Sequence, residues 1–210
     1  LLLFNFLTSI YIYSFGIFFT KTFLNEHTIR PRNFYDYGIY GAIFLSFIGL
    51  LLNFFTPLNK SLCTILFLIG LFYIFFNKDI FFSKKNYLHI LSPFILSSLL
   101  LIFSNANRPD AGLYHLPFIS IINENPIIIG LANIHFRFGH SSLIQYLSGI
   151  NNNFLFGDVG ITIPLSLLVS YLILYFYEEI RNLIKDKIFN YEVLYLFFLL
   201  IFILYSFNRY

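Results

Sequence analysis

Long apolar stretches separated by short polar connections run along most of the chain. They cover positions 1–20, 37–55, 61–76, 87–104, 159–177 and 193–208. A helix of about 20 apolar residues crosses the hydrocarbon core of a bilayer, and a shorter one can do so where flanking lysines reach the interface. The pattern therefore predicts an all-α fold, a polytopic bundle of about six transmembrane helices.

The composition also indicates an integral membrane protein. Hydrophobic residues make up 58% of the 210 positions and charged residues 11%, whereas a soluble domain carries roughly 25% charged residues. The net charge of +3 is scattered along the chain. We expect no nucleic-acid partner, because nucleic-acid-binding proteins gather basic residues on one face. The single cysteine, Cys63, lies in an apolar stretch, which predicts a buried and unreactive thiol.

Basic residues are distributed unevenly between the two sides of the predicted membrane. The connections 21–36, 78–86 and 178–190 carry three Lys or Arg residues each, nine in all, while the segments on the opposite side carry four. Cytoplasmic loops of membrane proteins are enriched in Lys and Arg. We therefore expect these three connections to be cytoplasmic, in a multi-pass protein of the cell inner (plasma) membrane that is surrounded by membrane lipid.

The one long connection, 105–158, then faces outside the cytoplasm. The expected organisation is a four-span region at 1–104, an extracytoplasmic loop at 105–158, and two further spans at 159–210. Because the first residue is leucine and both ends of the chain are apolar, we interpret the chain as a fragment of a longer protein.

Polar and ionisable groups are concentrated in the 105–158 loop. The stretches 113–123 and 143–147 have amphipathic spacing, and Asn125-Pro126 separates them. This pattern predicts short amphipathic helices that lie on the membrane surface over the mouth of the bundle. The candidate site residues in this loop are Arg108, Asp110, His115, His135, Arg137 and His140.

Two motifs in the loop carry a family resemblance. The texts DAGLYHLP at 110–117 and NPIIIGLANIHFRFGHSS at 125–142 resemble a motif pair of bacterial polytopic membrane proteins that are similar to the GT-C superfamily of lipid-linked-sugar glycosyltransferases. The resemblance implies an outward-facing loop whose acidic residue activates the acceptor or binds a metal, with the sugar arriving on a polyprenyl phosphate. Asp110 matches that acidic position. The chain differs from the family pattern in placing four predicted spans before the loop and Ala111 where many members carry a second acid.

The residue types suit sugar transfer at a membrane surface. Asp110 could act as a general base or a metal ligand, and its place before an amphipathic stretch would equally suit a helix N-cap. Arg137 could hold a phosphate through its planar fork or anchor a lipid headgroup. The spacing His135-x-Arg137-x-x-His140 leaves a divalent metal as a candidate cofactor. Further candidates for binding the substrate are Arg108, His115, His135 and His140.

These features favour an enzyme, a membrane glycosyltransferase that transfers a hexose or pentose from a polyprenyl-phosphate donor during cell-envelope glycan biosynthesis. The alternatives are a flippase or transporter for lipid-linked sugars, a polysaccharide polymerase, and a noncatalytic subunit of envelope assembly. A transporter places ionisable groups in the membrane interior, whereas the six predicted spans contain no Asp, Glu, Lys or Arg. The sequence assigns no donor sugar, acceptor or oligomeric state.

Overall fold

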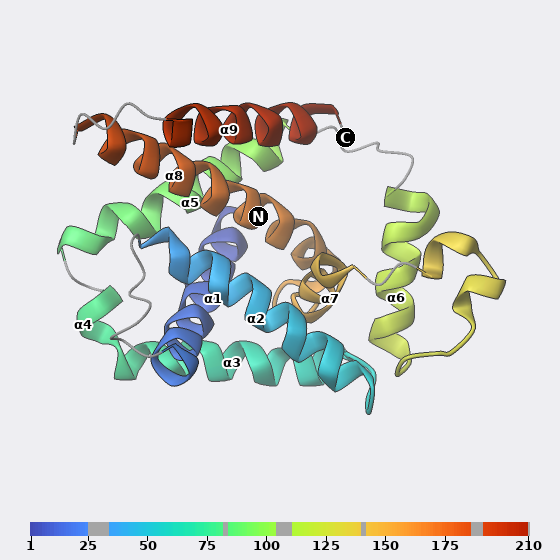
Figure 1. Ribbon diagram of the computed structural model, residues 1–210. Helices are drawn as coiled ribbons and strands as arrows, with labels where there is room; N and C mark the ends of the chain where they lie inside the picture. The colour runs from blue at the N-terminus through green and yellow to red at the C-terminus, as the bar shows by residue number, and fades with distance from the viewer. Residues whose placement is uncertain (25–33, 82–83, 104–110, 140–141, 186–190, 210) are drawn as a thin grey trace.

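The computed structural model of the protein describes residues 1–24, 34–81, 84–103, 111–139, 142–185 and 191–209, which form helices and turns (Figure 1). The α-helices are α1 (Leu2–Phe23), α2 (Tyr35–Asn53), α3 (Lys60–Phe76), α4 (Lys78–Phe81), α5 (Lys84–Phe103), α6 (Leu116–Glu124), α7 (Leu143–Ile150), α8 (Ile163–Lys185) and α9 (Tyr191–Arg209). Shorter helical turns are η1 (Ala111–His115), η2 (Leu131–Asn133), η3 (Phe136–Gly139) and η4 (Gly157–Thr162). No strand occurs among the described residues, so the predicted all-α class is confirmed.

Four helical segments are long and apolar enough to cross a membrane. They are α1, α2, the 86–103 part of α5, and the segment Gly157–Lys185 that contains α8. The stretches predicted as the third and sixth spans form shorter apolar helices, α3 and the Tyr191–Tyr205 part of α9. A membrane protein is therefore supported by four candidate spans, and the number six stays a prediction. The small helix α4 lies within the predicted connection 78–86.

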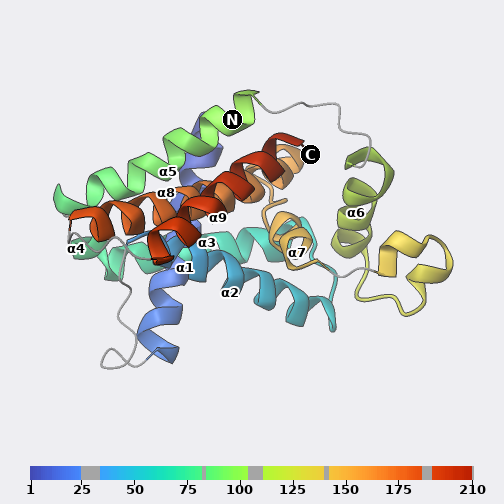
Figure 2. The same cartoon turned by 45° about the horizontal axis from the view of Figure 1, so that its top comes forward.

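The long helices form one bundle with different structures at its two ends. Figures 1 and 2 both place α4 at one end, and at the other end α6 and the turns that follow it project beyond the long helices. Within the bundle α1 packs most extensively against α2, α5 packs against α8, and α9 packs against α8. Helix α6 and the turns that follow it thus lie outside the bundle, whereas α7 and α8 belong to it.

The contact between α1 and α2 depends on two glycines at a backbone crossing. A Cβ atom on Gly16 would overlap the carbonyl oxygen of Tyr37, and one on Gly41 would overlap the carbonyl oxygen of Ile12. Small residues let the backbones of membrane helices approach closely, which increases their van der Waals contact. These glycines therefore fix the distance between the first two candidate spans.

Uncharged polar side chains join α1, α5 and α8 inside the bundle. The Asn5 amide donates to Ser98 Oγ at 2.8 Å, and Ser97 Oγ donates to Asn5 Oδ1 at 3.1 Å. Ser97 also shares a 2.7 Å hydrogen bond with Ser166. Because hydrocarbon offers no competing partners, such bonds help membrane helices to associate. The bundle interior is thus held by neutral groups.

Helix α7 differs from the predicted surface helix. Six of its eight residues, Gln145 to Ile150, are buried, and α7 packs against α2, α6 and α8. Helix α6 is buried on one face only, since Phe118, Ile119 and Ile122 are buried and Leu116 is exposed. In α7 the polar face of the amphipathic pattern at 143–147 is covered by neighbouring helices as well.

Candidate functional site

The segment that projects from the bundle begins with a wide helical turn. Turn η1 is a single π-helical turn that continues directly into α6. Pro117 lies in the first turn of α6 and has no N–H to donate to the carbonyl of Leu113, four residues earlier. The missing bond favours a wider turn at this point, and such π turns are frequent at functional sites. The turn brings Tyr114 and His115 together, with ring centroids 4.2 Å apart.

The second half of the segment folds back through two 3₁₀ turns. Gly130 has φ of 91°, in the left-handed region that glycine adopts without strain, and it begins η2. The following turn η3 carries Arg137 between Phe136 and Phe138. The His135 ring stacks on Phe136 with centroids 5.0 Å apart and an angle of 19° between the planes. We call residues 111–139 the platform.

Arg137 lies over an aromatic face on the platform. Its guanidinium carbon is 4.5 Å from the ring centroid of Tyr114 and 5.7 Å from that of Phe136. A guanidinium held over an aromatic ring is stabilised by a cation–π interaction and loses part of its rotamer freedom before any ligand arrives. Tyr114 therefore links Arg137 on η3 to His115 on η1.

His115 also contacts the bundle through α7. Its Nδ1 lies 2.9 Å from Nε2 of Gln145, whose side chain is only 6% exposed. The next residue, Tyr146, packs edge-on against Phe118 of α6. Burial raises the pKa of the Tyr146 hydroxyl above its ordinary value, so this group stays neutral and does not act as a base at physiological pH.

The platform is attached to the end of α2 by one buried asparagine. The Asn53 amide donates to the carbonyl oxygens of Ile122 at 3.1 Å and Asn125 at 2.9 Å. The backbone N–H of Ile127 donates to the carbonyl oxygen of Asn53 at 2.8 Å. The two bonds from the Asn53 amide satisfy carbonyl groups at the C-terminal end of α6, and the bond from Ile127 satisfies the Asn53 carbonyl at the end of α2.

A second asparagine attaches α6 to the connection that precedes α3 and to α7. The Asn123 amide donates to the carbonyl oxygens of Leu58 at 2.7 Å and Gly149 at 3.1 Å, and its Oδ1 accepts from Asn152 at 3.1 Å. Cys63 lies beneath this junction with its side chain 0% exposed, and its thiol donates to Leu58 O at 3.3 Å. The prediction of a buried cysteine is confirmed.

The structure places three of the six predicted site residues. It brings both His115 and Arg137 into contact with the Tyr114 ring, whereas the His135 ring packs on Phe136 and Phe138. Arg108, Asp110 and His140 lie outside the described residues. Among the described residues no group of three His, Cys, Asp or Glu side chains could hold a metal ion.

Two residues of the cluster were not among the sequence candidates. Tyr114 supplies the ring beneath Arg137, and Gln145 contacts His115. A signal for Gln145 is present in the sequence, because it is a polar side chain within the amphipathic segment LIQYLSGI. Tyr114 gave no comparable signal in a chain that contains 16 tyrosines.

A second polar cluster lies at the opposite end of the bundle. His89 Nδ1 on α5 is 3.3 Å from the Tyr35 hydroxyl on α2 and 3.9 Å from Glu178 Oε2 on α8. Arg181 donates to Glu178 Oε1 at 2.9 Å. The Glu178 side chain is 16% exposed, so most of it is covered by neighbouring groups. This cluster joins three helices through groups that pair with one another.

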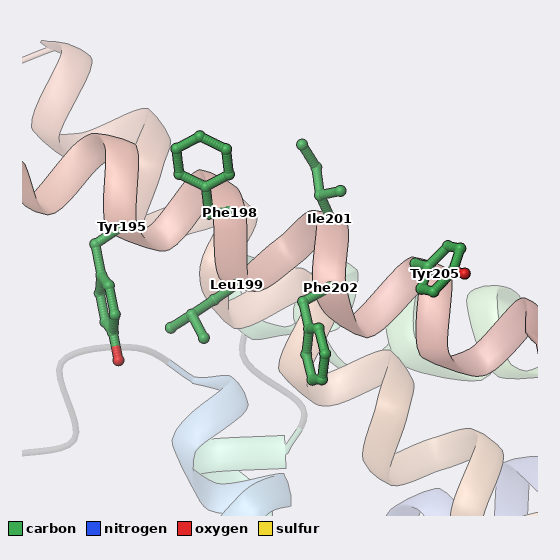
Figure 3. A pocket seen from close by; sticks show the side chains of 6 residues that line it. All are labelled: Tyr195, Phe198, Leu199, Ile201, Phe202 and Tyr205. Atoms are coloured by element: carbon green, nitrogen blue, oxygen red, sulfur yellow. The ribbon is translucent and has the colours of Figure 1, made fainter.

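An apolar hollow of about 460 Å³ lies on α9 (Figure 3). All of its lining residues come from that one helix and are Tyr195, Phe198, Leu199, Ile201, Phe202 and Tyr205. No carboxylate, imidazole or basic group of the described residues lines it. Its surface suits contact with apolar chains rather than bond-breaking chemistry, and the platform remains the stronger candidate site.

Comparison with known proteins adds a family to this geometry. No curated protein and no solved structure matches the chain. One family profile, described as a domain of unknown function (DUF8201), matches residues 1–209. Since the match covers almost the whole chain, the protein belongs to the DUF8201 family.

Proposed function

We propose that the protein is a multi-pass glycosyltransferase of GT-C type that uses a polyprenyl-phosphate-linked sugar in cell-envelope glycan biosynthesis. The observation that carries the proposal is the meeting of Arg137, Tyr114 and His115 on a platform outside the candidate spans. A cation with a planar fork of donors matches a phosphate group. An imidazole beside it supplies a further polar contact to the same ligand.

Each candidate residue has a role in the proposed transfer. The acceptor oxygen attacks the anomeric carbon, the bond from that carbon to the phosphate oxygen breaks, and polyprenyl phosphate leaves with the electron pair. Asp110 takes the proton of the acceptor hydroxyl as general base. Arg137 and His115 stabilise the charge that grows on the leaving phosphate. Arg108, His135 and His140 complete the substrate-binding set. In the alternative role, Asp110 would hold a divalent metal instead of acting as the base.

The proposed orientation follows from the charge distribution. The connections 21–36, 78–86 and 178–190 would be cytoplasmic, and the platform would face outside. A membrane-embedded donor could then present its phosphate at the lipid surface while its polyprenyl chain stays in the bilayer.

The distribution of polar groups favours surface chemistry over transport. Acidic and basic side chains of the four candidate spans lie near the ends of those segments, for example Lys21, Asp36 and Arg181. The interior bonds between α1, α5 and α8 are made by neutral Asn and Ser side chains. Transporters of charged substrates place ionisable residues near the middle of the membrane.

The test measures sugar transfer in membranes that contain the full-length protein. The donors are undecaprenyl phosphates that carry radiolabelled glucose, galactose, mannose or arabinose, and the readouts are label in glycan and label on intact donor in each leaflet. Wild type should move label from one of these donors into glycan. Arg137→Gln should reduce that rate roughly 10²–10³-fold, as loss of one transition-state donor does.

A matched control separates the site from a general loss of positive charge. Lys78→Gln removes an exposed cation at the start of α4, at the opposite end of the bundle, and should leave the rate unchanged. Wild-type activity in Arg137→Gln at equal abundance would overturn the proposal. So would intact donor crossing the bilayer without transfer, which would identify a flippase.

A further inference from the structure

The contact between Gln145 and His115 constrains where the imidazole carries its proton. Gln145 Nε2 is the atom that faces His115 Nδ1, at 2.9 Å. An amide nitrogen is a donor only, and the ring nitrogen of a neutral imidazole that lacks hydrogen is an acceptor. With the amide in this orientation, Nδ1 accepts and the ring proton lies on Nε2.

The burial of Gln145 supports this orientation of its amide. Its Oε1 is buried and has no hydrogen-bond partner among the described residues. If the amide were turned by 180°, Oε1 would accept a hydrogen bond from the imidazole. The NH₂ group would then be the buried group without a hydrogen-bond partner. Orphaned buried N–H groups are rarer than under-satisfied carbonyl oxygens, so the observed orientation is the less costly one.

The burial of α7 makes the contact between Gln145 and His115 rigid. Gln145 to Ile150 are buried in continuous sequence, and Asn123 holds Gly149 of the same helix through a 3.1 Å hydrogen bond. The His115 ring also lies close to that of Tyr114, with centroids 4.2 Å apart. The imidazole is therefore held by two contacts, and Gln145 reaches it from a helix that does not belong to the platform.

We infer that Gln145 is a positioning residue that holds His115 as the neutral tautomer with its proton on Nε2. The role of a histidine depends on which ring nitrogen carries the proton, and that is set by the hydrogen bond of the other nitrogen. The N–H group on Nε2 is then a hydrogen-bond donor, and His115 is not the base that takes the proton of the acceptor hydroxyl. The functional half of this inference rests on the proposed glycosyl transfer, whereas the tautomer does not.

The test reads the tautomer directly by nitrogen NMR. Full-length protein with ¹⁵N-labelled histidine is placed in lipid nanodiscs without any donor, and the His115 signals are assigned by their loss in His115→Asn. In wild type at neutral pH, Nδ1 should have the shift of a nitrogen without hydrogen and Nε2 that of one bonded to hydrogen. A hydrogen-bearing Nδ1 in wild type would overturn the inference.

Two nearly isosteric variants show whether Gln145 is the cause. Gln145→Glu offers only acceptors, so the proton should move to Nδ1, and Gln145→Met should give a mixture of both tautomers. Signals identical to wild type in both variants would also overturn the inference. A folded state in each variant is checked by the other four histidines, whose signals should stay in place.

Transfer assays on the same samples separate this inference from the proposed function. If the protein is a transferase, Gln145→Glu should lower kcat roughly 10²–10³-fold with a much smaller change in KM, because the lost donation acts on the leaving group. A wild-type rate in Gln145→Glu would overturn the functional half. No transfer by wild type together with the expected tautomer shifts would overturn the proposed function and leave the tautomer assignment standing.

Discussion

The attachment of the platform can be tested through Asn123 and the single cysteine. Asn123 makes three side-chain hydrogen bonds, to Leu58, Gly149 and Asn152. Cys63 is buried under the same junction and donates to Leu58 O. Opening of this junction should expose the thiol, so the rate of Cys63 alkylation measures how often the junction opens.

The expected magnitude follows from the bonds that Asn123→Leu removes. Leucine has the same number of side-chain heavy atoms, so little cavity forms. Three hydrogen bonds at about 1 kcal/mol each are lost, and the buried amide of Asn152 is left without its acceptor, which costs about 1–3 kcal/mol more if no water replaces it. Because Asn123 is only half-buried, we expect the free energy needed to open the junction to fall by about 2–4 kcal/mol. At about 1.4 kcal/mol per tenfold change, alkylation should accelerate roughly 30- to 1000-fold.

The assay follows alkylation of the native protein by N-ethylmaleimide in detergent micelles. Asn133→Leu is the matched control, since Asn133 is exposed in η2 and surface changes usually stay within about 0.5 kcal/mol. An alkylation rate in Asn123→Leu that equals the control would refute the reasoning, because the junction would then not depend on Asn123.

Three further predictions concern topology, helix packing and the candidate base. A cysteine at Glu124 should react with an impermeant thiol reagent outside intact cells, while one at Lys185 should react only after permeabilisation; the reverse pattern would contradict the proposed orientation. Gly41→Ala should lower the melting temperature because its Cβ would overlap α1, whereas Gly112→Ala meets no atom within 4 Å and should have little effect on it. Asp110→Asn keeps the ability to cap a helix N-terminus but removes the charge that a general base needs. A fall in turnover of roughly 10²–10⁴-fold at equal abundance would support Asp110 as the base, whereas wild-type turnover would leave it with a capping role only.

The helices could be predicted because their signal is local. Each apolar stretch reports directly on a helix that avoids water, and all six predicted stretches contain a helix. The crossing of α1 and α2 was harder to foresee. A glycine in an apolar stretch has several structural uses, and only the opposed backbone shows that Gly16 and Gly41 face each other's helices.

The burial of α7 could not be predicted from its own residues. Its amphipathic pattern indicates that one face avoids water, but a surface helix and a helix inserted between others share that pattern. What distinguishes them is the polar face, where Gln145 meets His115 and Ser148 is buried. Those partners come from distant parts of the chain, so the pattern within 143–150 holds no information about them.

The distance along the chain between contacting residues also explains why the sequence predicted only two of the four residues in the cluster of His115, Arg137, Tyr114 and Gln145. His115 and Arg137 were singled out for their chemistry, and each is conspicuous in an apolar chain. Their geometry depends on Tyr114 and Gln145, which hold the two charged or titratable groups in place. A residue that binds a ligand is recognised by its functional group, whereas one that positions another is recognised only by contact. The assignment of the His115 proton therefore needed the packing of α7 and not the motif that contains His115.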